Sequence, residues 1–262
     1  VNRANLYAEQ LNNPDKAELD YSKCIDLEPN YIYAYQSRGD FYYNNSDYNK
    51  AIQDYSKILE LDPDNLYALF KRGLSYWYMG VNDKALVDFS RCEQLDKDKS
   101  FAKAGYLYNN MALAYRGLNQ YEKALEYYTK EIEIRPEAQL AYTNRAKLYA
   151  ELLNDPEKAE LDFNKAISLD STYIYGYRMR GDFYRVQGKY NEAISDYSDV
   201  LELEPGNIYA TFDRGRSYWY LNDFDKALID LLTCEELDLE QNFAISEHLY
   251  NVLALTYIGL YD

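Results

Sequence analysis

Two helical patterns separated by a short polar break alternate along the chain, and residues 32–65 show one such pair clearly. The first pattern contains Gly39, a break rich in Asn and Ser follows, and the second pattern places Ala51, Tyr55 and Ile58 on one helical face. Gly39 and Ala51 are small, which predicts that the two helices approach each other closely there. An Asp-Pro dipeptide then ends the second pattern, because proline cannot continue the helix that it follows.

This helix pair recurs about every 34 residues. A period of that length is typical of a solenoid, in which stacked helical pairs share one elongated core. The sequence therefore predicts an all-α fold, with residues 1–262 forming a single solenoid. Its units are 1–31, 32–65, 66–99, 105–138, 139–173, 174–207 and 208–241, followed by a first helix alone at 247–262.

A second, longer period contains the first. Residues 144–184 restate residues 2–42 without a gap, at an offset of 142 residues, which indicates a duplicated block of four units. The two copies agree at the repeating small and apolar positions that build the framework. Positions at which the copies differ are therefore the best guide to a binding site.

Small irregularities in the repeat predict local structure. Insertions at 100–104 and 242–246 precede the fourth and eighth units, and we expect the second helices before them, or the first helices after them, to be extended. The first and fifth units gain one residue between their helices. There Asn13 and Asp155, each followed by proline, suit the N-cap of the second helix.

Several positions recur in nearly every unit. Residues 32–65 carry Gly39, Tyr42, Tyr48, Ala51, Tyr55 and Pro63 at repeat positions 8, 11, 17, 20, 24 and 32. Alanine also occupies position 20 in Ala17, Ala85, Ala124, Ala159, Ala193 and Ala227. This pattern resembles the tetratricopeptide repeat over essentially the whole chain. The resemblance implies a right-handed superhelix of about seven and a half units, whose first helices line a concave groove that binds a peptide.

An arginine at position 7 departs from the leucine that is usual in the family, and an aspartate at position 23 accompanies it in the same units. The pairs are Arg3 with Asp20, Arg38 with Asp54, Arg72 with Asp88, Arg145 with Asp162, Arg180 with Asp196, and Arg214 with Asp230. The fourth unit lacks both and has Met111 and Tyr127 instead. This co-occurrence predicts an ion pair between the two helices of one unit, which would fix their register more than it would add stability.

Composition narrows the class of partner. Lys and Arg total 28 against 44 Asp and Glu, a net charge of −16, whereas nucleic-acid binders and proteins of anionic membranes are normally basic. No apolar run is long enough for a membrane helix. The acidity is compatible with neutral or basic protein partners, and it also keeps an elongated molecule in solution.

The sequence has few of the residues that catalysis or metal binding requires. His248 is the single histidine, which excludes a metal site with several histidines, and the sequence has neither a Cys-x-x-Cys pair nor a phosphate-binding Gly-rich loop. Cys24, Cys92 and Cys234 share position 27 in separate units, where we expect small buried thiols rather than disulfides. We therefore predict no enzyme activity, no cofactor and no metal site, and reduced thiols indicate a cytoplasmic location.

The candidate binding residues lie at the positions that face the groove in the family. Aromatic candidates are Tyr33, Tyr67, Phe70, Trp77, Tyr175, Tyr209, Phe212 and Trp219, although some of these rings could instead pack between neighbouring first helices. Asn110 and Asn144 are candidates for holding a peptide backbone. The second copy also replaces Gln36, Tyr43 and Leu74 by Arg178, Arg185 and Arg216, which would suit an acidic side chain or a carboxylate.

The sequence thus predicts a non-catalytic scaffold for protein–protein interaction, which binds a peptide or a helix of a partner protein in its groove. Two alternatives stay open. The chain begins and ends inside a predicted helix, so that it could be the regulatory or substrate-recruiting arm of a larger enzyme. The exposed ends of the array could also stack, which would give self-association.

Overall fold

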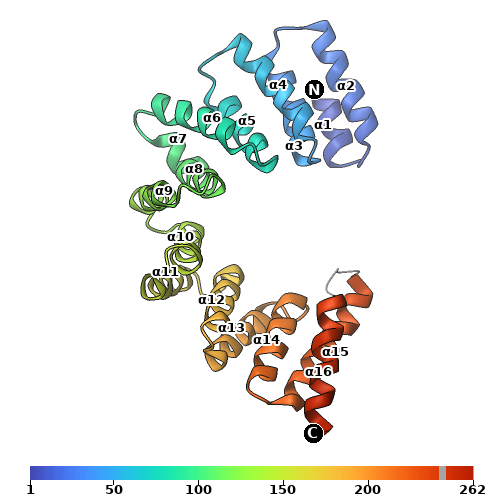
Figure 1. Ribbon diagram of the computed structural model, residues 1–262. Coiled ribbons are helices and arrows are strands. Elements are labelled where there is room, and N and C mark those ends of the chain that lie inside the picture. Colours follow the sequence, from blue (N-terminus) through green and yellow to red (C-terminus); the bar gives the residue numbers. More distant parts are fainter. Residues whose placement is uncertain (242–245, 262) are drawn as a thin grey trace. The chain divides into compact units, whose positions relative to one another are not determined.

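The computed structural model describes residues 1–241 and 246–261, without the side chains of 103–105, 238–241, 246, 247 and 261. All regular structure in this part is α-helical, which confirms the predicted fold class. The chain divides into two compact units, the N-terminal unit (Val1–Pro136) and the C-terminal unit (Glu137–Asp262), which are shown in Figure 1. A single array running through both stays a prediction from the repeat.

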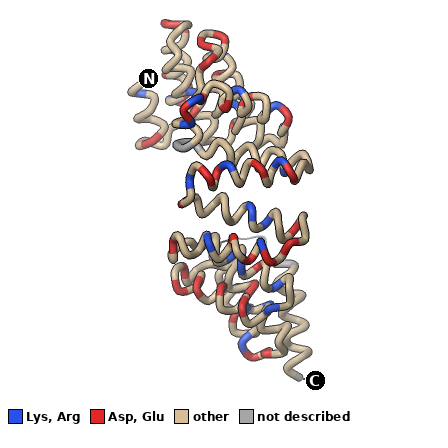
Figure 2. The backbone as a smooth tube through the Cα atoms, turned by 90° about the vertical axis from the view of Figure 1, so that its left-hand side faces the viewer, with Lys and Arg blue, Asp and Glu red and all other residues tan. Residues whose placement is uncertain are grey.

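Each of the seven predicted repeats within residues 1–241 folds with one first and one second helix, and the lone helix predicted at the end is α16. The N-terminal unit contains α1 (Asn2–Glu9), α2 (Pro14–Leu27), α3 (Ile32–Asn44), α4 (Tyr48–Leu61), α5 (Leu66–Tyr78), α6 (Asn82–Leu95), α7 (Ser100–Gly105), α8 (Leu107–Gly117) and α9 (Tyr121–Ile134). The C-terminal unit contains α10 (Gln139–Glu151), α11 (Pro156–Leu169), α12 (Ile174–Val186), α13 (Tyr190–Leu203), α14 (Ile208–Tyr220), α15 (Phe224–Gln241) and α16 (Ser246–Tyr261). Acidic and basic positions are interspersed along the helices of both units (Figure 2).

Local sequence explains where the second helices begin. The side chain of Asn13 accepts a hydrogen bond from the backbone N–H of Lys16, and Asp155 accepts the equivalent bond from Lys158, so both predicted N-caps are confirmed. Proline follows each cap at the first helical position, where its missing N–H leaves no bond unmade.

The two insertions behave differently. We expected residues 100–104 to extend a neighbouring helix, but they form the separate helix α7, which ends at Gly105 and is followed by Tyr106 with a left-handed φ of 56°. The carboxylate of Asp96 accepts the backbone N–H groups of Phe101 and Ala102, and this cap starts the new helix. Before the second insertion, α15 has 18 residues where other second helices have 14, which confirms the expected extension. Residues 242–245 lie outside the described part.

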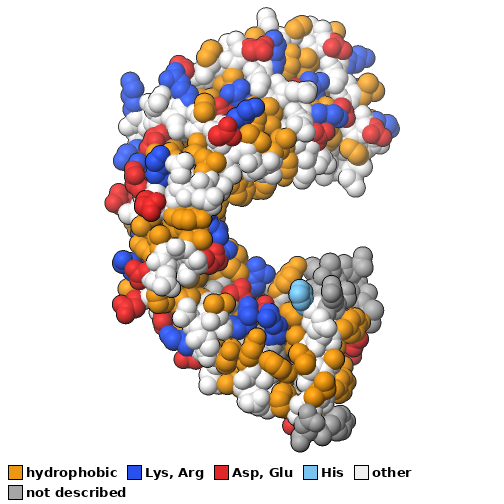
Figure 3. All heavy atoms as spheres, in the orientation of Figure 1, with side chains coloured by type: hydrophobic (Ala, Val, Ile, Leu, Met, Phe, Trp, Pro, Cys, Tyr) orange, Lys and Arg blue, Asp and Glu red, His pale blue; other side chains and the backbone are white. Residues whose placement is uncertain are grey.

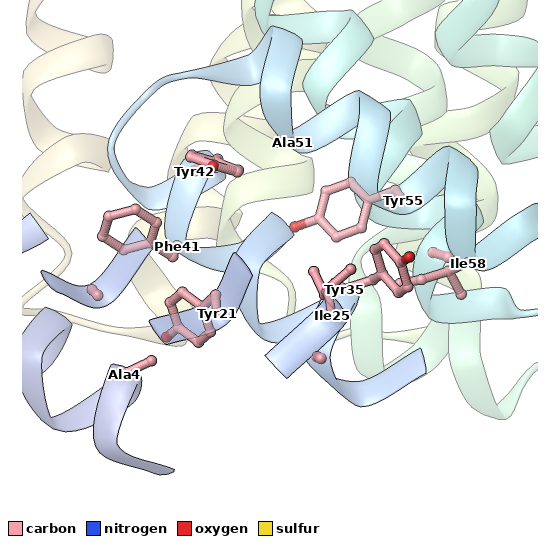
Figure 4. Close-up of a cluster of buried hydrophobic side chains, with 12 residues drawn as sticks. Ala4, Tyr21, Ile25, Tyr35, Phe41, Tyr42, Ala51, Tyr55 and Ile58 are labelled. Atoms are coloured by element: carbon pink, nitrogen blue, oxygen red, sulfur yellow. The ribbon is translucent and has the colours of Figure 1, made fainter. Parts of the chain in front are cut away.

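Close approach of the two helices in a pair explains the small residue at position 8. A Cβ atom added at Gly39 would lie 2.9 Å from Cε1 of Tyr55, and one added at Gly73 would lie 2.6 Å from Cε1 of Phe89. Both rings are fully buried. Figure 4 shows the ring of Tyr55 in the core cluster of the N-terminal unit, with Tyr35 and Ile58 beside it.

All six predicted Arg–Asp pairs form, and each joins the two helices of one repeat. Arg38 illustrates the geometry, with Nε and one terminal nitrogen donating to the two carboxylate oxygens of Asp54 at 2.9 and 2.7 Å. Its other terminal nitrogen donates to Oγ of Ser22, in the second helix of the preceding repeat. The same third bond joins Arg72 to Ser56, Arg180 to Asn164 and Arg214 to Ser198.

The fourth repeat closes without this pair. Met111 is fully buried at the arginine position, and the hydroxyl of Tyr127, at the aspartate position, donates to Glu93 of α6 at 3.1 Å. The Arg–Asp pair therefore joins the two helices of most repeats but is not required in every repeat.

Replacement of Gly73 tests the close approach of the helices. Gly73→Ala forces the buried ring of Phe89 to move, which should cost about 1–3 kcal/mol of overpacking and exceed the roughly 1 kcal/mol gained in helix propensity. The urea midpoint of unfolding, followed by circular dichroism, should fall. Gly206→Ala is the control, because a Cβ there meets nothing within 4 Å. Equal midpoints for the two variants would contradict the packing described.

Removal of Asp54 tests the buried pair. Asp54→Ala leaves the guanidinium of Arg38 half-buried without its carboxylate, which should lower the free energy of unfolding by about 3 kcal/mol. The matched variant Asp20→Ala breaks the same pair at the exposed Arg3, and there water replaces the lost partner. The urea midpoint should therefore fall far more for Asp54→Ala, and a comparable fall for both would be inconsistent with burial as the cause.

Candidate protein-binding surface

The first helices of successive repeats lie side by side and form one surface in each unit. In the C-terminal unit α10 contacts α12, α12 contacts α14, and α14 contacts α16. In the N-terminal unit the corresponding helices are α1, α3, α5 and α8 (Figure 1). We call these the two first-helix surfaces, and the predicted binding residues all belong to first helices.

The tyrosines at position 2 are the most accessible of these residues. Tyr33 and Tyr209 are 45% and 44% exposed and occupy position 2 of two different repeats, whereas their counterparts at the offset of 142 residues, Tyr175 and Tyr67, are less exposed. Tyr67 is more enclosed, because its hydroxyl donates to the carboxylate of Asp40 at 2.7 Å. The hydroxyl of Tyr175 accepts a hydrogen bond from Nζ of Lys147 at 3.4 Å. The hydroxyls of Tyr67 and Tyr175 are thus hydrogen-bonded to residues of the neighbouring first helix.

The phenylalanines contribute mainly to packing. Phe70 lies 5.8 Å from Phe89 and 5.4 Å from Phe101, measured between ring centroids. Phe212 is only 9% exposed and belongs to the core cluster formed with Ile208 and Leu231. Both residues therefore offer a partner much less surface than the sequence alone suggested.

Each tryptophan is covered by an adjacent exposed tyrosine. Trp77 packs against the core, and its ring meets Tyr78 edge-on at 4.8 Å, while Trp219 meets Tyr220 in the same way at 5.1 Å. Tyr78 is 53% exposed and Tyr220 is 44% exposed. The accessible aromatic surface at this end of the repeat is therefore the tyrosine, which stacks in turn on Tyr48 or on Tyr190 of the same unit.

The two asparagines do not present free amide groups. The side-chain nitrogen of Asn110 donates to the carbonyl of Tyr106 at 3.0 Å within the first turn of α8. Asn144 is 7% exposed and belongs to the buried polar residues of α10. A clamp on a peptide backbone by these two residues stays a prediction, and the structure adds no support to it.

Two of the three predicted arginines are already paired. Asp213 lies 3.5 Å from Nε of Arg185 and 3.1 Å from a terminal nitrogen of Arg216, and Arg185 also lies 3.7 Å from Asp182. Burial, together with the charge of Asp182, raises the pKa of the Asp213 carboxyl, and the two arginines oppose that shift. The charges of Arg185 and Arg216 are thus largely satisfied inside the protein.

The N-terminal copy has a different attractive contact at the equivalent positions. There Lys71 replaces Asp213, Tyr43 replaces Arg185, and the Nζ of Lys71 lies 4.6 Å from the centroid of the Tyr43 ring. A cation on a ring in one copy corresponds to an ion pair in the other. Both positions thus differ between the copies, and each copy has an attractive contact there.

Arg178 differs from the other two arginines, because it forms no ion pair in the described part of the chain. Its guanidinium carbon lies 5.4 Å from the ring centroid of Tyr209 and 6.0 Å from that of Tyr175. Lys147, on the neighbouring α10, is a further cation on this surface that the sequence analysis missed. The change from Asn5 to Lys147 between the copies was the signal that could have found it.

Cys92 belongs to the packing of the described residues. Burial raises the pKa of the Cys92 thiol to about 12, and its sulfur contacts the carbonyl of Leu66 at 3.6 Å. No group of three or more His, Cys, Asp or Glu side chains in this part of the chain could hold a metal ion. Among its helices, none combines the length and apolar character that crossing a bilayer requires.

Comparison with known protein families agrees with this architecture. Models described as "TPR repeat" or "Tetratricopeptide repeat" match residues 1–31, 21–53, 39–80, 105–137, 140–173 and 174–207. The chain belongs to the tetratricopeptide repeat family.

Similar proteins include two much longer ones. RNA polymerase II-associated protein 3 of Mus musculus is 41% identical over 92 residues, which is 35% of this chain and 14% of that protein. Hsp70-Hsp90 organizing protein 2 of Arabidopsis thaliana is 35% identical over 88 residues, or 34% of this chain and 15% of that protein. The chain therefore matches only about one seventh of the length of these relatives.

One solved structure covers nearly the whole chain. A tetratricopeptide repeat protein from Parabacteroides merdae ATCC 43184 aligns with 98% of this chain and 96% of its own, with a TM-score of 0.73 and 20% identity. At this identity the likeness shows the fold.

Exchanging residues between the copies tests whether the contacts of Lys71 and of Asp213 are interchangeable. Asp213→Lys places a third cation beside Arg185 and Arg216 in a partly buried site, which should destabilise the protein by about 2–4 kcal/mol. Adding Arg185→Tyr and Arg216→Leu recreates the contacts of Lys71 and should recover most of the loss. The measurement is the urea midpoint of unfolding. If the midpoint of the triple variant were no higher than that of Asp213→Lys, the two sets of contacts would not be interchangeable.

Proposed function

We propose that the chain is a non-catalytic scaffold for protein–protein interaction, and that its first-helix surfaces bind an extended or helical segment of a partner protein. The observation that carries this proposal is the placement of exposed tyrosines on these surfaces. Tyr33 and Tyr209 at position 2 of different repeats, and Tyr78 and Tyr220 at position 13 of corresponding repeats, are all at least 44% exposed.

Tyrosine suits such a surface for physical reasons. Its ring buries a large area with few rotatable bonds, and its hydroxyl can bond to a partner's backbone. Here the rings lie on helices whose register is held by the Arg–Asp pairs, so that little further entropy is lost on binding. Several such rings along one surface would add small contributions over one extended ligand.

The relatives support the same class of function. The name of Hsp70-Hsp90 organizing protein 2 describes a protein that organises two others, and RNA polymerase II-associated protein 3 is named for an association. Because the matched segments are small parts of those proteins, we carry over only the general role. A cytoplasmic location and stacking through the ends of the array stay predictions, and light scattering against protein concentration tests the stacking.

A second candidate is an interaction arm within a larger enzyme. It is favoured by the match to Serine/threonine-protein phosphatase 5 of Rattus norvegicus, which is named as an enzyme and of which the matched segment makes up 17%. The full-length gene product distinguishes the two functions, since a catalytic domain beside the repeats favours the arm.

Selection of peptides tests the proposed surface. The full chain is immobilised and a random dodecapeptide library displayed on phage is selected against it. Tyr33→Ser and Tyr209→Ser should together weaken binding of the enriched peptides by about tenfold, because each removes a central exposed ring.

Leu19→Ser and Leu161→Ser are the matched controls. These leucines are 67% and 68% exposed on the second helices α2 and α11, so the same kind of apolar surface is lost elsewhere. The controls should bind the peptides as the wild type does. Equal losses in both sets, or no enrichment on the wild type, would count against the proposed function.

A further inference from the structure

The residues just before the first insertion have different structures in the two copies of the duplicated block. In the N-terminal copy α6 ends at Leu95, residues 96–99 form a turn, and α7 begins at Ser100. In the C-terminal copy the residues at the offset of 142, residues 238–241, form the last turn of α15. A segment that is helical in one copy is therefore a turn in the other.

One carboxylate and an uncommon backbone conformation hold the turn. Asp96 is 7% exposed, and its carboxylate oxygens accept the backbone N–H groups of Phe101 and Ala102 at 3.0 and 2.7 Å. Lys99 and Tyr106, on either side of α7, have φ values of 58° and 56°. Residues other than glycine enter this left-handed region only at a cost, which the capping bonds offset.

α7 places an aromatic ring on the first-helix surface of the N-terminal unit. The ring of Phe101 meets that of Phe70 edge-on, with 5.4 Å between their centroids. Phe70 stands at repeat position 5 of α5, which faces the groove in the family, and hydrophobic side chains gather over α5 in Figure 3. Because residues 100–104 are an insertion that belongs to no repeat, this cover is an addition to the repeat pattern.

Extension of α6 through residues 96–99, as in α15, would remove the cover. Lys99 would then leave the left-handed region, and Asp96 would become part of a helix instead of capping the next one. The residue at the offset of 142 from Asp96 is also an aspartate, so the capping residue alone does not decide between the two structures. Two capping bonds and the contact of Phe101 with Phe70 favour the turn, whereas relief of backbone strain favours the extension.

We propose that α7 is an autoinhibitory strap on the first-helix surface of the N-terminal unit. In the closed state Phe101 covers Phe70. In the open state residues 96–99 extend α6, and the ring of Phe70 accepts an aliphatic or aromatic side chain of the partner segment. This inference rests on the proposed function and adds regulation to its site. A ligand that binds only the open state favours opening, and its apparent affinity is reduced by the fraction of protein that is open.

Removal of the covering ring tests the strap. The dodecapeptide library is selected on the full-chain wild type and on Phe101→Ser, and circular dichroism verifies that each variant is folded. Peptides enriched on Phe101→Ser should carry Leu, Met or Phe and should bind it about tenfold more tightly than the wild type, as measured by fluorescence polarisation. Adding Phe70→Ser should abolish this difference, because the uncovered ring is then absent.

Two further variants shift the equilibrium without changing either ring. Lys99→Gly should weaken binding of the same peptides, because glycine adopts a positive φ without strain and disfavours the extension of α6. Asp96→Ala should strengthen binding, because the turn loses both capping bonds. Lys99 is exposed, so its replacement should leave the fold intact. Shifts of the same sign in the two variants would contradict the strap.

Hydrogen exchange reports the opening directly. A saturating peptide should speed exchange of the backbone amides of Phe101 and Ala102 in the wild type, since their bonds to Asp96 are broken in the open state. If α7 were only part of the packing, the bound peptide would slow this exchange or leave it unchanged.

The two proposals fail in different ways. Peptides that bind Phe101→Ser and the wild type equally, or a gain that persists when Phe70→Ser is added, would overturn this inference and leave the proposed function standing. Unchanged or slower exchange at Phe101 with the peptide bound would overturn it as well. No enrichment on either protein would overturn both.

Discussion

The bidentate Arg–Asp pair is the contact on which the arrangement of the repeats depends. In Arg38, two donors hold Asp54 of the same repeat, and a third holds Ser22 of the preceding repeat. One guanidinium thereby sets both the register within a helix pair and the spacing between pairs. Because the pair is largely removed from water, its desolvation offsets much of its attraction, and we interpret it as a source of specificity more than of stability. The exposed tyrosines are presented at defined intervals for this reason.

The fourth repeat lacks the Arg–Asp pair and joins its two helices by other contacts. Its first helix follows the extra helix α7, and the fully buried carboxylate of Glu131 accepts the backbone N–H of Asn109 near the start of α8. Arg135 bonds to the same carboxylate and lies 3.6 Å above the ring of Tyr106. A buried acid at a helix N-terminus, balanced by an arginine, thus replaces the link used elsewhere. Loss of the repeating pair and gain of the insertion belong to one local solution.

The sequence predicted the features that follow from the repeat period and from residues that recur together at two repeat positions. Helix pairs, the caps at Asn13 and Asp155, and the six Arg–Asp contacts all follow from spacing that repeats several times. The separate helix α7 could not be predicted, because the carboxylate that caps it belongs to Asp96 of the preceding repeat. The burial of individual side chains within the first-helix surfaces could not be predicted either. Tyr33 is exposed and Phe212 is not, although both were assigned to the same groove, since neighbouring helices decide how much of each ring is covered.

Duplication separates two kinds of difference that a single repeat cannot distinguish. Where Lys71 became Asp213, the partner changed as well, from Tyr43 to Arg185, and an attractive internal contact survived. Such a change conserves the interior and says little about a ligand. Where Gln36 became Arg178, no ion pair formed among the described residues, although Asp213, which replaces Lys71, lines the same hollow. Because Arg178 is partly exposed to water, its charge costs little without an ion pair, whereas the more enclosed site of Asp213 requires its partners.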